Sequence, residues 1–123
     1  MFKLLVIDDE ISILNIFEIL FSKFGCLIDT ASNGEEGIQK FNEKRFDLVI
    51  TDIQMPYADG KTVLNHIRSS SAPSTPVVGI SAMPWLLEDC DFDLVISKPF
   101  SIKVLLDSVF NLLISTAKSL IVI

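Results

Sequence analysis

The chain has 123 residues, half of them apolar, and its sixteen acidic and ten basic side chains give a net charge of −6. This length allows one domain with a single core, and the negative charge argues against direct binding to nucleic acid or to an anionic membrane. No apolar stretch reaches the roughly 18 to 20 residues of a membrane span and no signal-peptide pattern opens the sequence, so we expect a cytoplasmic protein.

Apolar runs and helical periodicities alternate along the chain. Runs of β-branched and other apolar residues indicate buried strands, whereas apolar residues at i, i+3 and i+4 indicate helices. Ser12 is a candidate N-cap of the first helix, and Gly25 follows the last apolar residue of that helix as a stop signal. Asn33 is a candidate N-cap of the second helix, with Glu36 three residues further on. The expected elements are strands over residues 3–7, 26–31, 46–52, 76–81 and 93–97, and helices over residues 12–24, 34–44, 61–69 and 101–118.

The weakest element follows the fourth strand, where residues 83–90 allow at most two helical turns with Pro84 near their start. Five strands that alternate with helices predict an α/β fold with right-handed crossovers. We expect one doubly wound domain over residues 1–123, with a five-stranded parallel sheet of order 2-1-3-4-5, helices on both faces and a shortened or irregular fourth helix.

Reactive side chains follow four of the strands at their carboxyl ends. Asp8 and Asp9 follow the first strand, Asp52 ends the third, Ser81 ends the fourth and Lys98 follows the fifth. Because these ends meet at one edge of a parallel sheet, the three carboxylates would lie close together and repel one another. Oxygen ligands without His or Cys favour a hard divalent cation, and Mg²⁺ fits best. An aspartate nucleophile, Mg²⁺ and a lysine together indicate a site for a phosphoryl group.

Simpler interpretations exist for single residues. One acidic residue at a strand end is often only a solvated turn residue, although four complementary strand ends disfavour that interpretation here. Cys26 and Cys90 lack metal-ligand spacing and are interpreted as small buried side chains. His66 has no catalytic partner nearby in sequence and is interpreted as an ordinary histidine.

These residues resemble the receiver domain of bacterial two-component response regulators, over essentially the whole chain. The resemblance is carried by Asp8-Asp9, the block Asp52-x-x-Met55-Pro56-x-x-Asp59-Gly60, Ser81-Ala82 and Lys98-Pro99-Phe100. It implies a flavodoxin-like fold in which Asp52 accepts a phosphoryl group from a histidine kinase or a histidine phosphotransfer protein. It also implies that Asp8, Asp9, Asp52 and the Gln54 backbone carbonyl bind Mg²⁺.

By the same resemblance, Ser81 is the hydroxyl switch residue, Lys98 pairs with the phosphoryl group, and the Lys98–Pro99 peptide bond is cis. The chain departs from the family pattern at Val95, where members usually carry an aromatic switch residue, and Lys98 follows Ser81 by only 17 positions. Gln54 and Met83 are poorly suited to orient an attacking water, so we expect a long-lived phosphorylated form.

Two apolar segments suggest contacts with other molecules. In the family, the first helix meets the phosphodonor near the residues that follow the lysine, so we expect Ile13, Ile16, Pro99 and Phe100 to form a docking patch, although plain core packing is the alternative. The apolar tail over residues 120–123 suggests either self-association into a homodimer or a longer protein of which this chain is one part.

The leading functional hypothesis is a switch in which phosphorylation changes a surface that selects an unknown downstream protein. The only expected activities are self-phosphorylation and autodephosphorylation at Asp52. The alternative is a phosphorylation-independent protein interaction module on a receiver fold. A hydrolase of the haloacid dehalogenase type is disfavoured, because it needs Asp-x-Asp after the first strand and a cap insertion, whereas this chain has Asp8-Asp9 and no such insertion.

Overall fold

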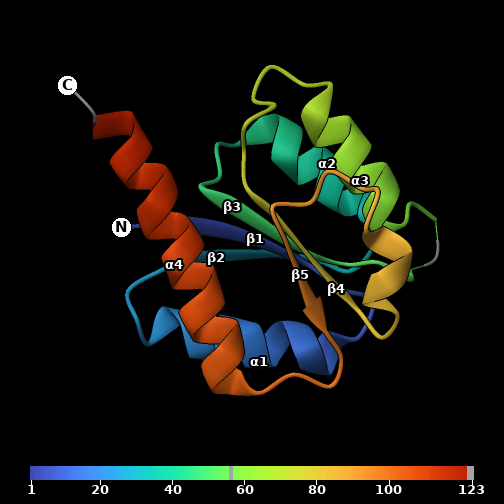
Figure 1. Ribbon diagram of the computed structural model, residues 1–123, viewed down its shortest axis with the longest axis horizontal. Helices are drawn as coiled ribbons and strands as arrows, with labels where there is room; N and C mark the ends of the chain where they lie inside the picture. Colours follow the sequence, from blue (N-terminus) through green and yellow to red (C-terminus); the bar gives the residue numbers. More distant parts are fainter. Residues whose placement is uncertain (56, 122–123) are drawn as a thin grey trace.

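The computed structural model describes residues 1–55 and 57–121, and it describes the side chains of the last helix up to residue 117. Pro56 of the motif and the side chains of the apolar tail over residues 120–123 therefore lie outside the described part of the chain. Strands and helices alternate as expected (Figure 1). They are β1 (Lys3–Ile7), α1 (Ile11–Ser22), β2 (Leu27–Ala31), α2 (Gly34–Glu43), β3 (Leu48–Asp52), α3 (Gly60–Arg68), β4 (Val77–Ser81), the 3-10 helix η1 (Pro84–Leu87), β5 (Leu94–Ser97) and α4 (Ile102–Ile121).

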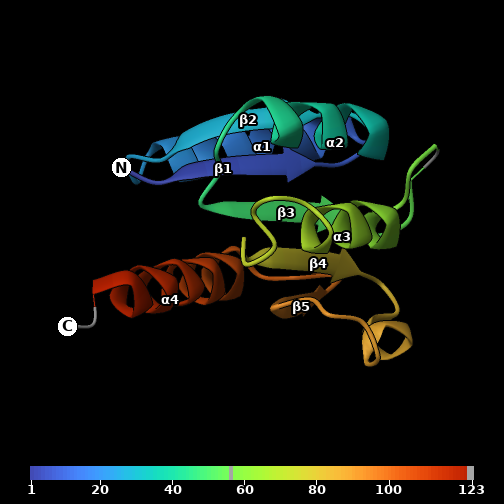
Figure 2. The ribbon, with the colours of Figure 1, turned by 90° about the horizontal axis from the view of Figure 1, so that it is seen from above.

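The five strands form one parallel sheet in the order β2-β1-β3-β4-β5, which confirms the predicted topology. Helices α1 and α4 cover one face, and α2 and α3 cover the other (Figures 1 and 2). Successive side chains of a strand point to opposite faces, so Leu4 and Val6 pack beneath α1 and α4 while Leu5 and Ile7 pack beneath α2 and α3. Among the described residues, no helix has the length and apolarity that a membrane crossing needs.

The start of α1 differs from the prediction. Ser12 lies inside the helix, so its assignment as N-cap was wrong: Glu10 is the N-cap residue and its side chain makes no capping hydrogen bond. The reason is local, because the Asp8 carboxylate accepts the Glu10 N–H at 2.9 Å and turns the chain directly after β1. The N-cap of α2 is confirmed, since Asn33 Oδ1 accepts the Glu36 N–H at 2.9 Å.

Within the connection from β4 to β5, all of which the structure describes, the helical part is limited to the four residues of η1 in place of a full helix, as predicted. Phe92 covers part of the sheet on this side: a Cβ atom added to Gly79 in β4 would lie 3.1 Å from the Phe92 ring. Phe92 also packs against the apolar cluster beneath α2 and α3. Because Gly79 has no side chain, the Phe92 ring can lie against the sheet and cover part of the face that a full helix would cover.

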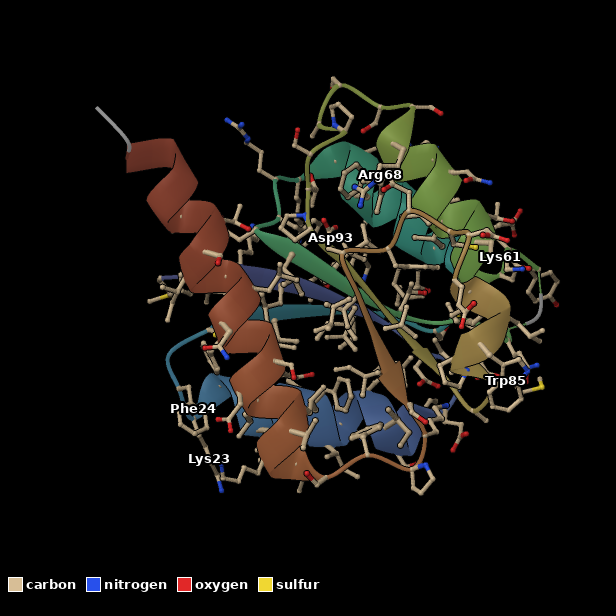
Figure 3. The ribbon with its side chains drawn as sticks, in the orientation of Figure 1. Lys23, Phe24, Lys61, Arg68, Trp85 and Asp93 are labelled. Carbon is tan, nitrogen blue, oxygen red and sulfur yellow. The ribbon has the colours of Figure 1, made fainter. Side chains whose placement is uncertain are left out.

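Arg68, at the end of α3, ties this connection to the rest of the fold. Its Nε and Nη2 groups donate to the Asp91 and Asp93 carboxylates at 3.0 and 2.7 Å. Nη2 also donates to the Asp91 carbonyl, and Nη1 donates to the carbonyls of Pro73 and Thr75. Asp93 Oδ2 in turn accepts the N–H of Val77, the first residue of β4, at 2.7 Å. We call these contacts the Arg68 clasp; Figure 3 shows Arg68 and Asp93 side by side.

The isolated cysteines and the histidine have ordinary surroundings. Cys26 is buried and Cys90 is half-buried, and both are free thiols. His66 Nε2 lies 2.7 Å from Asn42 Oδ1 at the surface. Cys26 is thus buried as interpreted, Cys90 is less buried than interpreted, and His66 is an ordinary surface histidine.

Candidate functional site

The parallel sheet brings the predicted strand-end residues to one edge. Asp8 and Asp9 follow β1, Asp52 is the last residue of β3, Ser81 is the last residue of β4 and Lys98 follows β5. One carboxylate oxygen from each of Asp8, Asp9 and Asp52 lies within 4.8 Å of the other two. The structure therefore assembles the acidic cluster that was expected from the sequence.

Asp52 is held firmly at the centre of this edge. It is only 7% exposed, and its Oδ1 atom accepts the Ile53 N–H at 3.0 Å and the Lys98 ammonium at 3.2 Å. Gly60 passes so close that a Cβ atom there would lie 2.6 Å from the Asp52 carbonyl oxygen. A glycine at position 60 is therefore needed to bring the start of α3 against the end of β3.

The cluster has more buried negative charge than the described residues neutralise. Burial raises the pKa of Asp8 to about 6, the hydrogen bond from the Glu10 N–H opposes this shift, and the charge of Asp52 adds to it. Burial also raises the pKa of Asp52, although the Lys98 ammonium lowers it. Carboxylates whose pKa rises in this way gain stability from an added cation, and an all-oxygen donor set fits Mg²⁺. The residues present therefore fit the metal ion that was expected.

Ser81 and Lys98 are linked through the backbone of the same edge. The Lys98 N–H donates to the Ser81 carbonyl at 2.9 Å, and Ser81 Oγ accepts the Met83 N–H at 3.0 Å. Because Ser81 Oγ acts as an acceptor in this bond, its own O–H remains available as a donor. The Lys98–Pro99 peptide bond is cis, as the resemblance implied.

The residues beside the cluster take the following positions. Gln54 is exposed and, together with Ser81 and Met83, lines a pocket of about 510 Å³ next to the cluster. Val95, in the position of the usual aromatic switch residue, is half-buried in β5. Sequence reasoning missed Tyr57, whose φ of 68° places a bulky residue in the left-handed region within the loop after Asp52.

The four predicted docking residues divide into two exposed and two half-buried side chains. Ile16 and Pro99 are exposed. Ile13 packs against the core cluster, and the Phe100 ring lies 5.9 Å from the Phe17 ring, so these two side chains also support the core. Ile11 and Ile102, at the starts of α1 and α4, are also exposed and were not predicted as docking residues.

Comparisons with known proteins agree with this geometry. The family model for the response regulator receiver domain matches residues 4–110. The probable transcriptional regulator ycf27 of Guillardia theta is 37% identical over 106 residues, which cover 82% of this chain and 41% of that protein. The chain spans less than half the length of the first curated relatives that it matches.

Two solved structures are similar to this chain in both fold and sequence. The response regulator TrrA of Thermotoga maritima, in complex with Mg²⁺ and BeF, is 33% identical with a TM-score of 0.83, and the match covers 91% of this chain and 99% of that chain. A response regulator receiver domain from Clostridium thermocellum is 30% identical with a TM-score of 0.87, and the match covers 98% and 99% of the two chains.

Proposed function

The chain belongs to the response regulator receiver domain family of two-component signalling, and from this we propose that Asp52 is the acceptor of a phosphoryl group. The observation that carries the proposal is the 3.2 Å contact between Asp52 and Lys98 inside a cluster of three carboxylates. A buried nucleophile beside one lysine and a cation site has the parts that phosphoryl transfer requires.

Asp8, Asp9, Asp52 and the Gln54 backbone carbonyl would hold Mg²⁺ in this proposal. When bound, the ion would neutralise negative charge on the oxygens of the transferred group. The relative TrrA, which is 33% identical, was solved with Mg²⁺ and BeF, and this supports the same cofactor here.

The side chains divide the work of the transfer. Oδ1 of Asp52 is occupied by the Ile53 N–H and by Lys98, and no described residue hydrogen-bonds to Oδ2, so Oδ2 is the proposed nucleophile. Asp52 Oδ2 forms a bond to phosphorus while the bond between phosphorus and the imidazole nitrogen of the phosphodonor breaks, and the imidazole keeps the electron pair. Lys98 exchanges part of its contact with Asp52 for a phosphoryl oxygen, and the Ser81 hydroxyl donates to another.

The proposed phosphodonor is a histidine kinase or a histidine phosphotransfer protein that docks on exposed Ile11, Ile16, Pro99 and Ile102. A helix of this phosphodonor would cover the apolar side chains that α1 and α4 expose to water. Autodephosphorylation at Asp52 would be the only other reaction. Because curated relatives carry names of transcriptional regulators, gene expression is the output that we favour, through a downstream protein or segment.

A phosphorylation-independent interaction module is the second candidate. Val95 in β5 and the four-residue η1 support it, because both alter the parts that normally convey the switch. This candidate keeps the acidic site but assigns it no signalling role.

Intact mass after incubation with Mg²⁺ and acetyl phosphate separates the two candidates. The parent protein should gain the mass of one phosphoryl group, and Asp52→Asn should gain none. Lys98→Ala should bind Mg²⁺ yet react far more slowly. An unmodified parent protein that nevertheless binds Mg²⁺ would contradict the switch and leave the interaction module.

A further inference from the structure

A hydroxyl side chain is completely buried in β3, directly before the proposed phosphoryl acceptor. Thr51 is 0% exposed, and the three residues before it in the strand, Leu48–Ile50, are all apolar. Alternation along the strand places Thr51 on the same face as Val49, beneath α2 and α3. Valine has almost the same shape and no polar atom, so a hydroxyl at this position needs a hydrogen bond that compensates for its burial.

That hydrogen bond goes to the backbone of Asp52. Thr51 Oγ1 donates to the Asp52 carbonyl oxygen at 2.8 Å. Gly60 packs against the same oxygen, since a Cβ atom added to this glycine would lie 2.6 Å from it. The Asp52 carbonyl is therefore held by the Thr51 hydroxyl and enclosed by the start of α3.

The other end of the same peptide group holds the Asp52 side chain. The Ile53 N–H donates to Asp52 Oδ1 at 3.0 Å and to the Ile80 carbonyl at 3.2 Å. Because a peptide group is planar, the hydroxyl that fixes its C=O also fixes the direction of its N–H. Among the described residues, only the Lys98 ammonium also donates to Oδ1. The Ile53 N–H and Lys98 thus decide together how the carboxylate is turned.

We propose that Thr51 is a positioning residue for phosphoryl transfer: its hydroxyl holds the peptide group between Asp52 and Ile53, so that Oδ1 is fixed and Oδ2 stays directed at phosphorus. This inference rests on the proposed function of Asp52. During the transfer Lys98 turns partly to the phosphoryl group, so the Ile53 N–H is the contact that keeps the carboxylate from rotating away from its reactive geometry. Thr51 acts only through the backbone of Asp52.

Thr75 supplies a matched control at the other end of the sheet. It is 9% exposed, lies just before β4, and its Oγ1 donates to the Ala72 carbonyl at 2.8 Å. Thr51→Val and Thr75→Val therefore remove the same kind of hydrogen bond, but only Thr51→Val does so beside Asp52. Intact mass follows the gain of a phosphoryl group with Mg²⁺ and acetyl phosphate, at a temperature at which circular dichroism shows every variant folded.

Thr51→Val should lower the rate at saturating acetyl phosphate about tenfold, because that factor corresponds to about one hydrogen bond. The acetyl phosphate concentration for half-maximal rate should change less than about twofold, since Thr51 does not bind the phosphodonor. Thr51→Ala also lacks the hydroxyl and should be as slow. Thr51→Ser keeps the hydroxyl and should react within about threefold of the parent, and Thr75→Val should react within about twofold.

A second measurement reports on the peptide group itself. In ¹⁵N-labelled, unphosphorylated protein, the Ile53 amide signal should move in Thr51→Val and stay in place in Thr75→Val. The inference alone is overturned if the parent reacts and Thr51→Val reacts equally fast, if Thr75→Val is slowed to the same extent, if Thr51→Ser does not recover the rate, or if the Ile53 signal stays in place. A parent protein that gains no phosphoryl group overturns the proposed function of Asp52, and the role of Thr51 with it.

Discussion

Replacing Arg68 should reveal how much stability the Arg68 clasp supplies. Its five guanidinium N–H groups all have acceptors at 2.7 to 3.0 Å, and the side chain is only 19% exposed. In Arg68→Ala, Asp91 returns to water at little cost because it is 84% exposed, and Asp93 keeps its bond from the Val77 N–H. The main losses are the partner of the Thr75 carbonyl, which belongs to a buried residue, and the ion pair with Asp93.

Together these losses predict a fall in the free energy of unfolding of about 2 to 3 kcal/mol. Urea unfolding followed by far-ultraviolet circular dichroism measures this change directly. Arg68→Lys is the matched control: it keeps the charge but cannot reach both carboxylates and the carbonyls at once, so it should recover less than half of the loss. A change below about 0.5 kcal/mol for Arg68→Ala, or a fully stable Arg68→Lys, would refute the role of the clasp.

Three further predictions concern the site and its loop. Gly34→Ala would place a methyl group onto the backbone of Ala58, so the loop after β3 must move; urea unfolding should show a loss of about 1 to 3 kcal/mol, and no loss would mean that the loop yields freely. Tyr57→Gly should raise the free energy of unfolding by about 1 kcal/mol, because glycine tolerates the positive φ, whereas Tyr57→Ala should give no such gain. In the absence of Mg²⁺, the raised pKa of Asp8 means that the native state holds a proton that the unfolded state has released between about pH 4 and 6, so stability from this group falls as pH rises through that window. The stability of Asp8→Asn relative to the parent should therefore increase as the pH rises from about 4 to about 6, and a difference that stays constant over this range would exclude the shifted pKa.

Local sequence patterns were sufficient to predict the order of the strands and helices and the topology of the sheet. Apolar runs and helical periodicity located the strands and helices, and alternation of the two predicted the parallel sheet and hence the meeting of Asp8, Asp9 and Asp52. Asn33 was recognised as an N-cap because its partner is only three residues away. Ser12 was misassigned because the Asp8 carboxylate, which belongs to the preceding turn, decides where α1 begins.

Features that depend on distant residues were not predictable in the same way. The Arg68 clasp joins residues up to 25 positions apart, and nothing in the local sequence marks Asp93 as a partner of Arg68. The pocket beside η1 likewise depends on how two separate loops approach each other. Tyr57 gave no local signal for a positive φ, because the conformation follows from the path of the loop between Asp52 and α3.

Gly79 in β4 and the Phe92 ring after η1 are packed so closely that the size of one side chain limits the size of the other. A methyl group at position 79 would lie 3.1 Å from both the Phe92 ring and the Ile53 side chain, so it has room only if both give way by a few tenths of an ångström or the ring at position 92 becomes smaller. Descendants of this sequence should therefore change the two positions together, exchanging bulk in the strand for bulk after η1.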